Sequence, residues 1–135
     1  MLWTESGGIQ MANKFNAKKM VTPEGTFDSR KEHRRWCELK LLERAGKISD
    51  LQRQVTFELI PTQREESPGV YKAGPQKGLP KPGDIIEQGC RYVADFVYQQ
   101  DGKTVVEDCK GYRTEGYKIK RKLMLWVHGI SIKET

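Results

Sequence analysis

The sequence predicts an α/β (α+β) fold in which a mixed central sheet of about four strands is flanked by helices, in the order αβββαβ. Two segments carry apolar residues at helical spacing, and each is followed by a glycine suited to ending a helix. The remaining segments alternate between apolar and polar residues or are rich in Tyr, Val and Phe, as strands are. Both kinds of segment in one short chain indicate helices packed on a sheet.

Length and composition limit the class of protein. The 135 residues favour one domain, and 24 Lys and Arg against 18 Asp and Glu give a formal net charge of +6. The longest unbroken apolar run, Leu123–Val127, is far shorter than the roughly 20 residues of a membrane-spanning helix, so we expect no membrane partner. No secretory signal is evident. Three widely spaced cysteines lack disulfide or zinc spacing, which favours the cytoplasm.

The first helix is predicted to begin at Ser29. Residues 1–25 show no periodicity and are expected to form a basic extension to a single domain spanning residues 26–133. Ser29 and Glu32 have the spacing of a capping box, and Gly46 is a suitable stop. The buried stripe of this helix is expected to contain Trp36, Leu39 and Leu42.

Three strands are expected to follow. The first, Leu51–Ile60, alternates apolar and polar residues. Residues 61–89 are rich in proline and glycine and read as a long loop or short ribbon, which in a small domain is usually functional or mobile. The next two strands, Arg91–Gln99 and Lys103–Lys110, are joined by Asp101-Gly102, a strong hairpin signal.

A second helix and a short last strand complete the predicted fold. The helix spans roughly Glu115–His128 and is ended by Gly129, and the strand is Ile130–Ile132. The side of the helix expected to be buried carries Ile119, Leu123, Trp126 and Val127.

The hairpin places two acids opposite each other. With Asp101 and Gly102 as the central turn residues, Asp95 lies directly across from Asp108. Directly opposed residues share a face, with Cβ atoms roughly 4.5–5.5 Å apart, and like charges placed there destabilise the sheet. A shared proton, a basic neighbour or a metal cation must therefore neutralise them. Lys110, two residues after Asp108, lies on the same face.

Glu32 is a third acid of interest. It lies four residues before Trp36 on the apolar stripe of the first helix. The third position of a capping box favours glutamate, and that role alone could explain it. A carboxylate near the start of a helix that packs on the sheet can also reach the acid pair. We favour this second interpretation.

Positive charge is clustered in two stretches, which would attract polyanions such as a phosphate backbone. A solvated, lysine-rich helix face explains the charge equally well. The candidate DNA-binding residues are Arg34 and Arg35 in the first helix, with Arg113, Lys118, Lys120, Arg121 and Lys122 in and before the second.

The acids and the lysine resemble the PD-(D/E)XK nuclease superfamily. Ala94-Asp95 stands on one strand, Asp108-Cys109-Lys110 on the next, and Glu32 on a preceding helix. The Asp-x-Lys motif alone is weak, but its combination with the hairpin register is much more specific. Over about residues 26–133 the chain is similar to a family of small phage and prophage proteins near the Holliday-junction resolvases of that superfamily. Ala94 stands where the superfamily motif has proline.

The resemblance implies a restriction-endonuclease-like core that cleaves DNA with a divalent metal. Asp95 and Asp108, together with the backbone carbonyl of Cys109, would hold Mg²⁺ or Mn²⁺. Lys110 would position or deprotonate the attacking water, and Glu32 would hold that water or a second metal. Mg²⁺ prefers carboxylate and water oxygens and supports phosphodiester hydrolysis.

The expected activity is structure-selective cleavage of branched DNA, such as Holliday junctions, during phage recombination or replication in a bacterial host. Two symmetric cuts need two sites, so a homodimer is expected by analogy. Two alternatives remain open. One is a non-catalytic nucleic-acid-binding module, and the other is a nuclease of the same superfamily that cuts linear duplex DNA.

Overall fold

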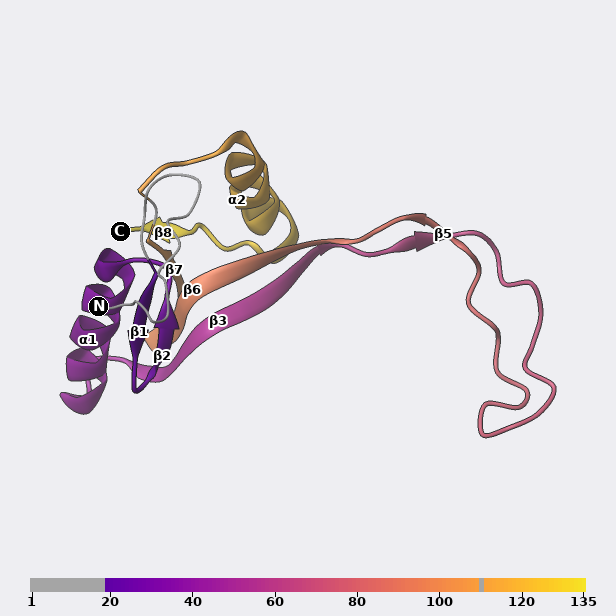
Figure 1. The fold of residues 1–135 in the computed structure, drawn as a ribbon, viewed down its shortest axis with the longest axis horizontal. Helices are drawn as coiled ribbons and strands as arrows, with labels where there is room; N and C mark the ends of the chain where they lie inside the picture. The colour runs from indigo at the N-terminus through magenta and orange to yellow at the C-terminus, as the bar shows by residue number, and fades with distance from the viewer. Residues whose placement is uncertain (1–18, 110) are drawn as a thin grey trace.

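The structure, a computed structural model, describes residues 19–109 and 111–135. Its central sheet has the strand order β3-β6-β7-β8, in which only the β7–β8 pair is parallel (Figure 1). The predicted fold class, a mixed four-stranded sheet flanked by helices, is confirmed. The elements are β1 (Met20–Thr22), β2 (Gly25–Phe27), α1 (Arg30–Arg44), β3 (Ser49–Ile60), β4 (Gln63–Arg64), β5 (Ile85–Glu87), β6 (Cys90–Gln100), β7 (Lys103–Asp108), α2 (Glu115–His128) and β8 (Lys133–Glu134).

The two helices pack on opposite faces of the sheet. Leu39 of α1 is buried with Phe96 of β6, whereas Met124 of α2 is buried with Val106 of β7. Val105, the neighbour of Val106, packs against the α1 cluster. Because successive side chains of a strand point to opposite faces, α1 and α2 must cover different faces. Neither helix of the described part has the length and apolar character needed to cross a bilayer.

The two longest strands change face halfway along. Phe96 packs with α1, yet Ala94, two residues earlier, packs with α2. On β3, Leu51 likewise packs with α1 and Val55 with α2. The change falls at Gln54, whose φ of 52° is uncommon for a residue other than glycine. This conformation interrupts the alternation, so one pair of strands supplies both cores.

The hairpin register is as predicted. Asp101 and Gly102 have φ values of 53° and 76°, the pattern of a two-residue type I′ turn. Gln100 pairs with Lys103, and the ladder continues to Phe96 opposite Glu107. Asp95 and Asp108 lie one residue beyond this last pair, where the same register would place them opposite each other.

The predicted helix ends are also confirmed. The Ser29 side chain accepts a hydrogen bond from the Glu32 backbone N–H at 3.1 Å, which caps α1. Gly46 follows α1 with a φ of 76°, and Gly129 ends α2 with a φ of 69°. Both glycines adopt the left-handed conformation that commonly terminates helices.

The predicted buried face of α2 is wrong for three of its four residues, and only Leu123 packs against the core. Trp126 is 86% exposed, and Ile119 and Val127 are also exposed, whereas Tyr117 and Met124 are buried. The run Leu123–Val127 is apolar on every side of the helix, so periodicity alone could not select the face that meets the sheet.

Two boundaries also differ from expectation. The β1–β2 hairpin begins at Met20, before the expected domain start at residue 26, and strands of three residues are too short to show a period. The last strand is β8 rather than Ile130–Ile132, and Ile132 instead belongs to the core beneath α2.

Residues 61–89 form a two-stranded arm that extends β3 and β6 away from the body (Figure 1). Its strands, β4 and β5, pair antiparallel, and further out Val70 bridges Pro80. Of the two forms expected for this segment, a loop or a ribbon, the structure has the ribbon.

The corrected face of α2 makes a stability prediction. Replacing the fully buried Met124 with alanine should lower the free energy of unfolding by about 2–5 kcal/mol, because the substitution leaves a cavity. Trp126→Ala removes a larger but exposed side chain and should change it by less than about 0.5 kcal/mol. Urea unfolding of both variants would measure this, and a larger loss for Trp126→Ala would contradict the described packing.

Candidate active site

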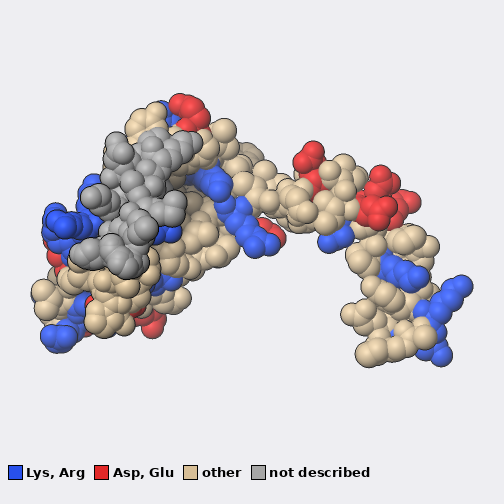
Figure 2. All heavy atoms as spheres, in the orientation of Figure 1, with Lys and Arg blue, Asp and Glu red and all other residues tan. Residues whose placement is uncertain are grey.

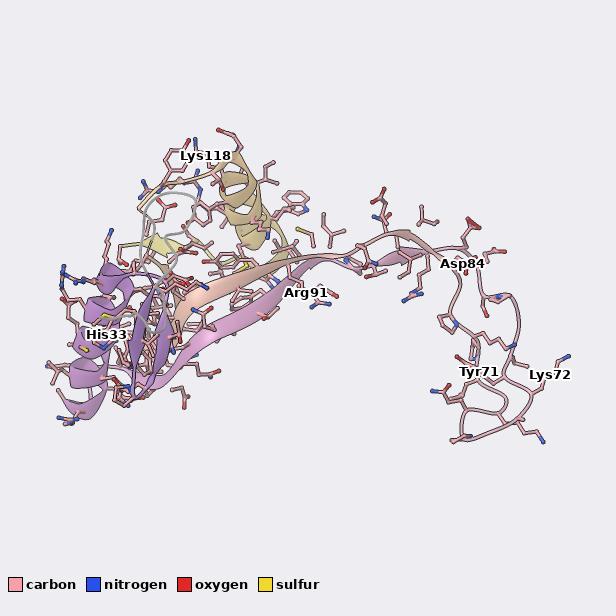
Figure 3. The ribbon with its side chains drawn as sticks, viewed as in Figure 1. His33, Tyr71, Lys72, Asp84, Arg91 and Lys118 are labelled. Carbon is pink, nitrogen blue, oxygen red and sulfur yellow. The ribbon has the colours of Figure 1, made fainter. Side chains whose placement is uncertain are left out.

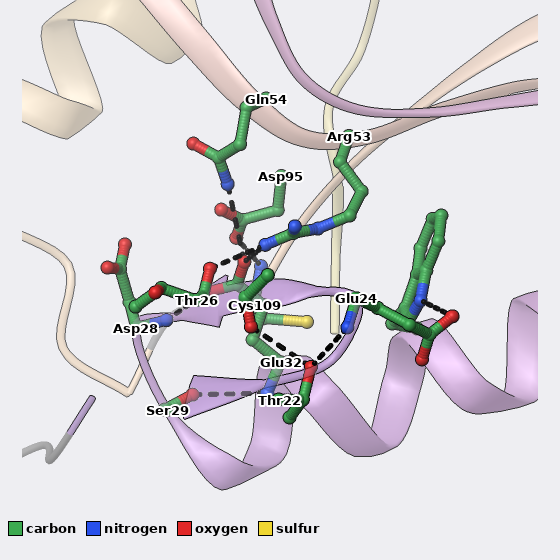
Figure 4. Close-up of polar contacts among 12 residues, drawn as sticks. Thr22, Glu24, Thr26, Asp28, Ser29, Glu32, Arg53, Gln54, Asp95 and Cys109 are labelled. Atoms are coloured by element: carbon green, nitrogen blue, oxygen red, sulfur yellow. Dashed lines mark hydrogen bonds and ion pairs between the residues drawn. The ribbon is translucent and has the colours of Figure 1, made fainter. Parts of the chain in front are cut away.

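Two of the three predicted acids, Glu32 and Asp95, lie where the first turn of α1 meets the centre of the sheet (Figure 4). Glu32 comes from α1, Asp95 from β6 and Asp108 from the end of β7. All three are buried, Glu32 being 2% exposed and Asp108 0%. The predicted catalytic lysine, Lys110, lies outside the described residues.

Protein hydrogen bonds hold one oxygen of each acid of the strand pair. The backbone N–H of Cys109 donates to Oδ2 of Asp95 at 2.8 Å, a bond that crosses between the two strands. The hydroxyl of Tyr92 donates to Oδ2 of Asp108. Burial raises the pKa of Tyr92, and the bond to Asp108 raises it further. The phenol therefore stays protonated and remains a donor. Tyr92 therefore fixes the orientation of Asp108.

Glu32 takes part both in the helix start and in the acid cluster. Its Oε1 accepts the backbone N–H of Asp28 at 3.1 Å, which stabilises the turn entering α1. Its Oε2 accepts the side-chain amide of Gln54 at 3.3 Å and lies 3.7 Å from a guanidinium nitrogen of Arg53. The capping and site interpretations of Glu32 are therefore compatible.

The surroundings of Glu32 disfavour its charge. Burial raises the pKa of this carboxyl above its usual value, and the negative charges of Asp28 and Asp108 raise it further. The Asp28 N–H and Arg53 act in the opposite direction and do not fully compensate. The ionised form of Glu32 is thus destabilised first by burial and further by the acids near it.

Glu107 shows how the fold neutralises a buried acid elsewhere. Its carboxylate accepts two hydrogen bonds from Arg35, at 2.8 and 2.7 Å, and one from the hydroxyl of Tyr98. Burial alone would raise the pKa of Glu107, but these bonds outweigh it and hold the pKa below its usual value. Glu107 thus faces the α1 side of the sheet, since Arg35 belongs to α1.

Arg35 therefore has a role inside the fold. Its guanidinium binds Glu107 and also Glu38, at 2.9 Å, so its donors are directed toward protein carboxylates. Removing one partner of such a buried ion pair is strongly destabilising, because a charge remains buried. Because its guanidinium is committed to these carboxylates, we do not propose Arg35 as a DNA contact.

Cys109 makes structural contacts. Its Sγ lies 3.1 Å from the hydroxyl oxygen of Thr135, and burial raises the pKa of the thiol to about 11. A thiol with such a pKa stays protonated at neutral pH and is a poor nucleophile. The role expected for its carbonyl oxygen as a metal ligand stays a prediction.

The other predicted DNA-binding residues divide into two groups. Arg113 and Arg121 both bind Glu134, at 3.0 and 3.1 Å, and Lys118 binds Glu115 at 3.2 Å. Arg34 and Lys122 are exposed, and Lys120 is half-buried. The positive charges of Arg113, Arg121 and Lys118 are partly neutralised by their acid partners. Arg34, Lys120 and Lys122 are the better candidates for contact with phosphates.

A pocket of about 340 Å³ lies between α1 and the ends of β7 and β8 and is lined mainly by basic side chains. The parallel pairing of β7 and β8 brings Lys133 next to the start of α1. Lys133 was not predicted as a site residue. It lies 25 residues after Asp108 in the sequence, and only the pairing of β7 with β8 brings it to this pocket. The pocket is lined by Lys31, Arg34, Arg35, Glu38, Cys109, Lys133 and Thr135.

The described acids do not form a preassembled metal centre. Within residues 19–109 and 111–135, no three histidine, cysteine or carboxylate side chains are already gathered around a common point. The donor types still suit a hard dication, since Glu32, Asp95 and Asp108 offer only carboxylate oxygens. The raised pKa of Glu32, due in part to Asp108, shows that added positive charge would relieve repulsion there.

Comparison with known proteins gives one match. The profile of a family described as "Protein of unknown function (DUF1064)" matches residues 12–129. No curated protein and no solved structure shows detectable similarity to the chain.

Glu32 and Glu107 should affect stability with opposite signs. Because the pKa of Glu32 is raised, its penalty is absent below its unfolded value of 4.5 and grows as pH rises above it. Without divalent metal, Glu32→Gln should therefore be more stable than the parent at pH 7, on the order of 1 kcal/mol, and no more stable near pH 4.

Glu107→Gln is the matched control. The pKa of Glu107 is lowered, so its stabilisation is present above 4.5 and is lost as pH falls through the folded value. This variant should be less stable at pH 7, by about 1–3 kcal/mol, with a smaller deficit in acid. Urea unfolding at both pH values measures each effect. A Glu32→Gln protein less stable than the parent at pH 7 would contradict the described electrostatics.

Proposed function

The chain belongs to the DUF1064 family, and we propose that it is a metal-dependent DNA endonuclease. The observation that carries the proposal is the burial of three acids from three separate elements: Glu32 of α1, Asp95 of β6 and Asp108 of β7. Burying several carboxylates near one another is unfavourable unless something compensates their charge. The chain is basic and carries a pocket lined mainly by basic side chains at the start of α1, and phosphodiester cleavage is a use that accounts for both the acids and the basic charge.

Asp95 and Asp108 are the residues we expect to hold Mg²⁺ or Mn²⁺, joined by the carbonyl oxygen of Cys109. When bound, the dication would supply Lewis acidity, lower the pKa of a bound water and offset developing negative charge. Glu32 would orient that water or a second ion. Lys110, which follows Asp108 by two residues, would position or deprotonate the attacking water.

Tyr92, which the sequence did not identify, and the backbone N–H of Cys109 support this arrangement. The Tyr92 hydroxyl fixes one oxygen of Asp108, and the Cys109 N–H fixes one oxygen of Asp95. Oδ2 of each acid is thus held in an orientation set by the sheet. A carboxylate positioned in this way needs less reorganisation when it binds an ion.

DNA would approach across the basic pocket and the start of α2. Arg34, Lys120 and Lys122, with Lys133 as an addition, are the side chains best placed to contact phosphates. Arg113 and Arg121, paired with Glu134, and Lys118, paired with Glu115, would contribute less, because these acids partly neutralise them. We infer a branched DNA substrate, a homodimer making two cuts, and action in the cytoplasm of a bacterial host during phage recombination or replication.

The activity is tested by incubating the protein with a four-way junction and with linear duplex, each with Mg²⁺ or Mn²⁺. We expect cleavage of the junction that chelation abolishes. Asp95→Asn, Asp108→Asn and Lys110→Ala should each lower the rate by roughly 10²–10⁴-fold, the scale of losing one positioned catalytic group. Glu58→Gln, at an exposed position of β3, is the matched control and should cleave normally.

The alternatives give different results in the same assay. Equal cleavage of linear duplex would assign the chain to nucleases that act on linear DNA. Binding that is unaffected by metal, with no cleavage of either substrate, would favour a non-catalytic nucleic-acid-binding module. Cleavage that survives in both Asp108→Asn and Lys110→Ala would rule out the proposed site.

A further inference from the structure

The arm has separated charges along its length. Residues 67–83, which we call the arm tip, contain three lysines and no acid. Closer to the body, the arm carries four acids and one arginine: Arg64, Glu65, Glu66, Asp84 and Glu87. Figure 2 shows this as blue side chains at the tip and red ones along the ribbon before it.

The arm tip has a defined backbone structure. The Gly78 N–H donates to the carbonyl of Tyr71 at 2.9 Å, and the Lys81 N–H donates to the carbonyl of Gly69 at 2.8 Å. The ammonium of Lys81 lies 5.9 Å from the centre of the Tyr71 ring. Figure 3 places Tyr71 and Lys72 on the tip, with Asp84 at the ribbon before it. The tip thus holds its lysines in a fixed arrangement.

A glycine lets the two strands of the arm cross closely before the tip. A Cβ added to Gly83 would lie 1.9 Å from the carbonyl oxygen of Glu65, far inside contact distance. Any side chain at Gly83 would force the strands apart and displace the tip.

We propose that the arm tip binds the phosphate backbone of the DNA substrate at a distance from the cleavage site. This inference rests on the proposed function. Lys72, Lys77 and Lys81 supply the positive charge, and the acids behind them repel DNA, so contact is confined to the tip. A two-stranded ribbon without further packing is only marginally stable in water, which also favours a role in holding a partner.

The length of the arm sets a lower limit on how far from the acids this contact falls, because the arm tip lies beyond Arg64 (Figure 1). From Gln54, beside the acids, to Arg64 the chain advances ten residues along two successive strands. At about 3.3 Å per residue this spans roughly 33 Å, close to one turn of B-DNA, about 10 base pairs. The substrate class is therefore DNA with a duplex arm extending at least about one turn beyond the cut.

The test compares two triple variants that remove the same charge. Lys72→Ala/Lys77→Ala/Lys81→Ala alters the arm tip, whereas Arg44→Ala/Lys47→Ala/Lys103→Ala alters exposed residues of the body. The Kd of each protein is measured against salt, without divalent metal, for junctions with arms of about 20 and about 8 base pairs. Gly83→Val keeps all three lysines but displaces the arm tip.

On the long-armed junction, the tip variant should bind about 10-fold or more weakly, and its salt slope should fall by about 2–3, roughly 0.9 per lost phosphate contact. The short-armed junction should bind the tip variant and the parent equally. Gly83→Val should resemble the tip variant, and the body variant should resemble the parent.

An unchanged Kd and salt slope for the tip variant on long arms would overturn the inference. So would an equal loss on short arms, or an equal loss in the body variant, since either would indicate general electrostatics. Cleavage of the short-armed junction by the parent, measured separately with Mg²⁺, tests the proposed function itself. If the parent does not cleave, the proposed function fails, but the metal-free binding comparison still tests the arm tip. The two failures are therefore distinguishable.

Discussion

The structure depends on the register of one hairpin. Because Asp101 and Gly102 form a two-residue turn, every later pair of β6 and β7 is fixed, and Asp95 is brought opposite Asp108. A slip of one residue would exchange the two faces of a strand. Glu107 would then leave Arg35 and Asp108 would face α1. The same turn therefore sets both the structural ion pair and the acid cluster.

The change of face at Gln54 explains how one sheet serves two helices and one site. On β3, residues after Gln54 pack with α2, and Leu51 before it packs with α1. Asp95 lies opposite this point, so its carboxylate is close to the first turn of α1, where Glu32 begins the helix. An unbroken alternation would have separated the helix acid from the strand acids. The strained residue thus lies where the candidate site is, as strained backbone often does.

Local signals made much of this predictable. Caps, glycine stops and the hairpin turn act over a few residues, and the structure confirms Ser29, Gly46, Gly129 and the turn at Asp101-Gly102. The positions of the three acids followed from register and helical spacing, while their chemical role stays a prediction.

Contacts between distant segments were not predictable in the same way. Arg35 reaches Glu107 across 72 residues, and Tyr92 reaches Asp108 across 16. The exposed position of Trp126 depends on how α2 is rotated against the sheet, which an all-apolar run does not specify. Neither the arm's ribbon form nor its reach has a periodic signal in a segment rich in proline and glycine.

A crystal structure with Mn²⁺, read by anomalous scattering, tests the central claim most directly. We predict one strong peak bound by carboxylate oxygens of both Asp95 and Asp108, at about 2.0–2.2 Å as for hard dications, and no such peak in Asp108→Asn. A crystal of the parent protein in millimolar Mn²⁺ with no peak between these residues, or with Mn²⁺ bound only elsewhere, would contradict it.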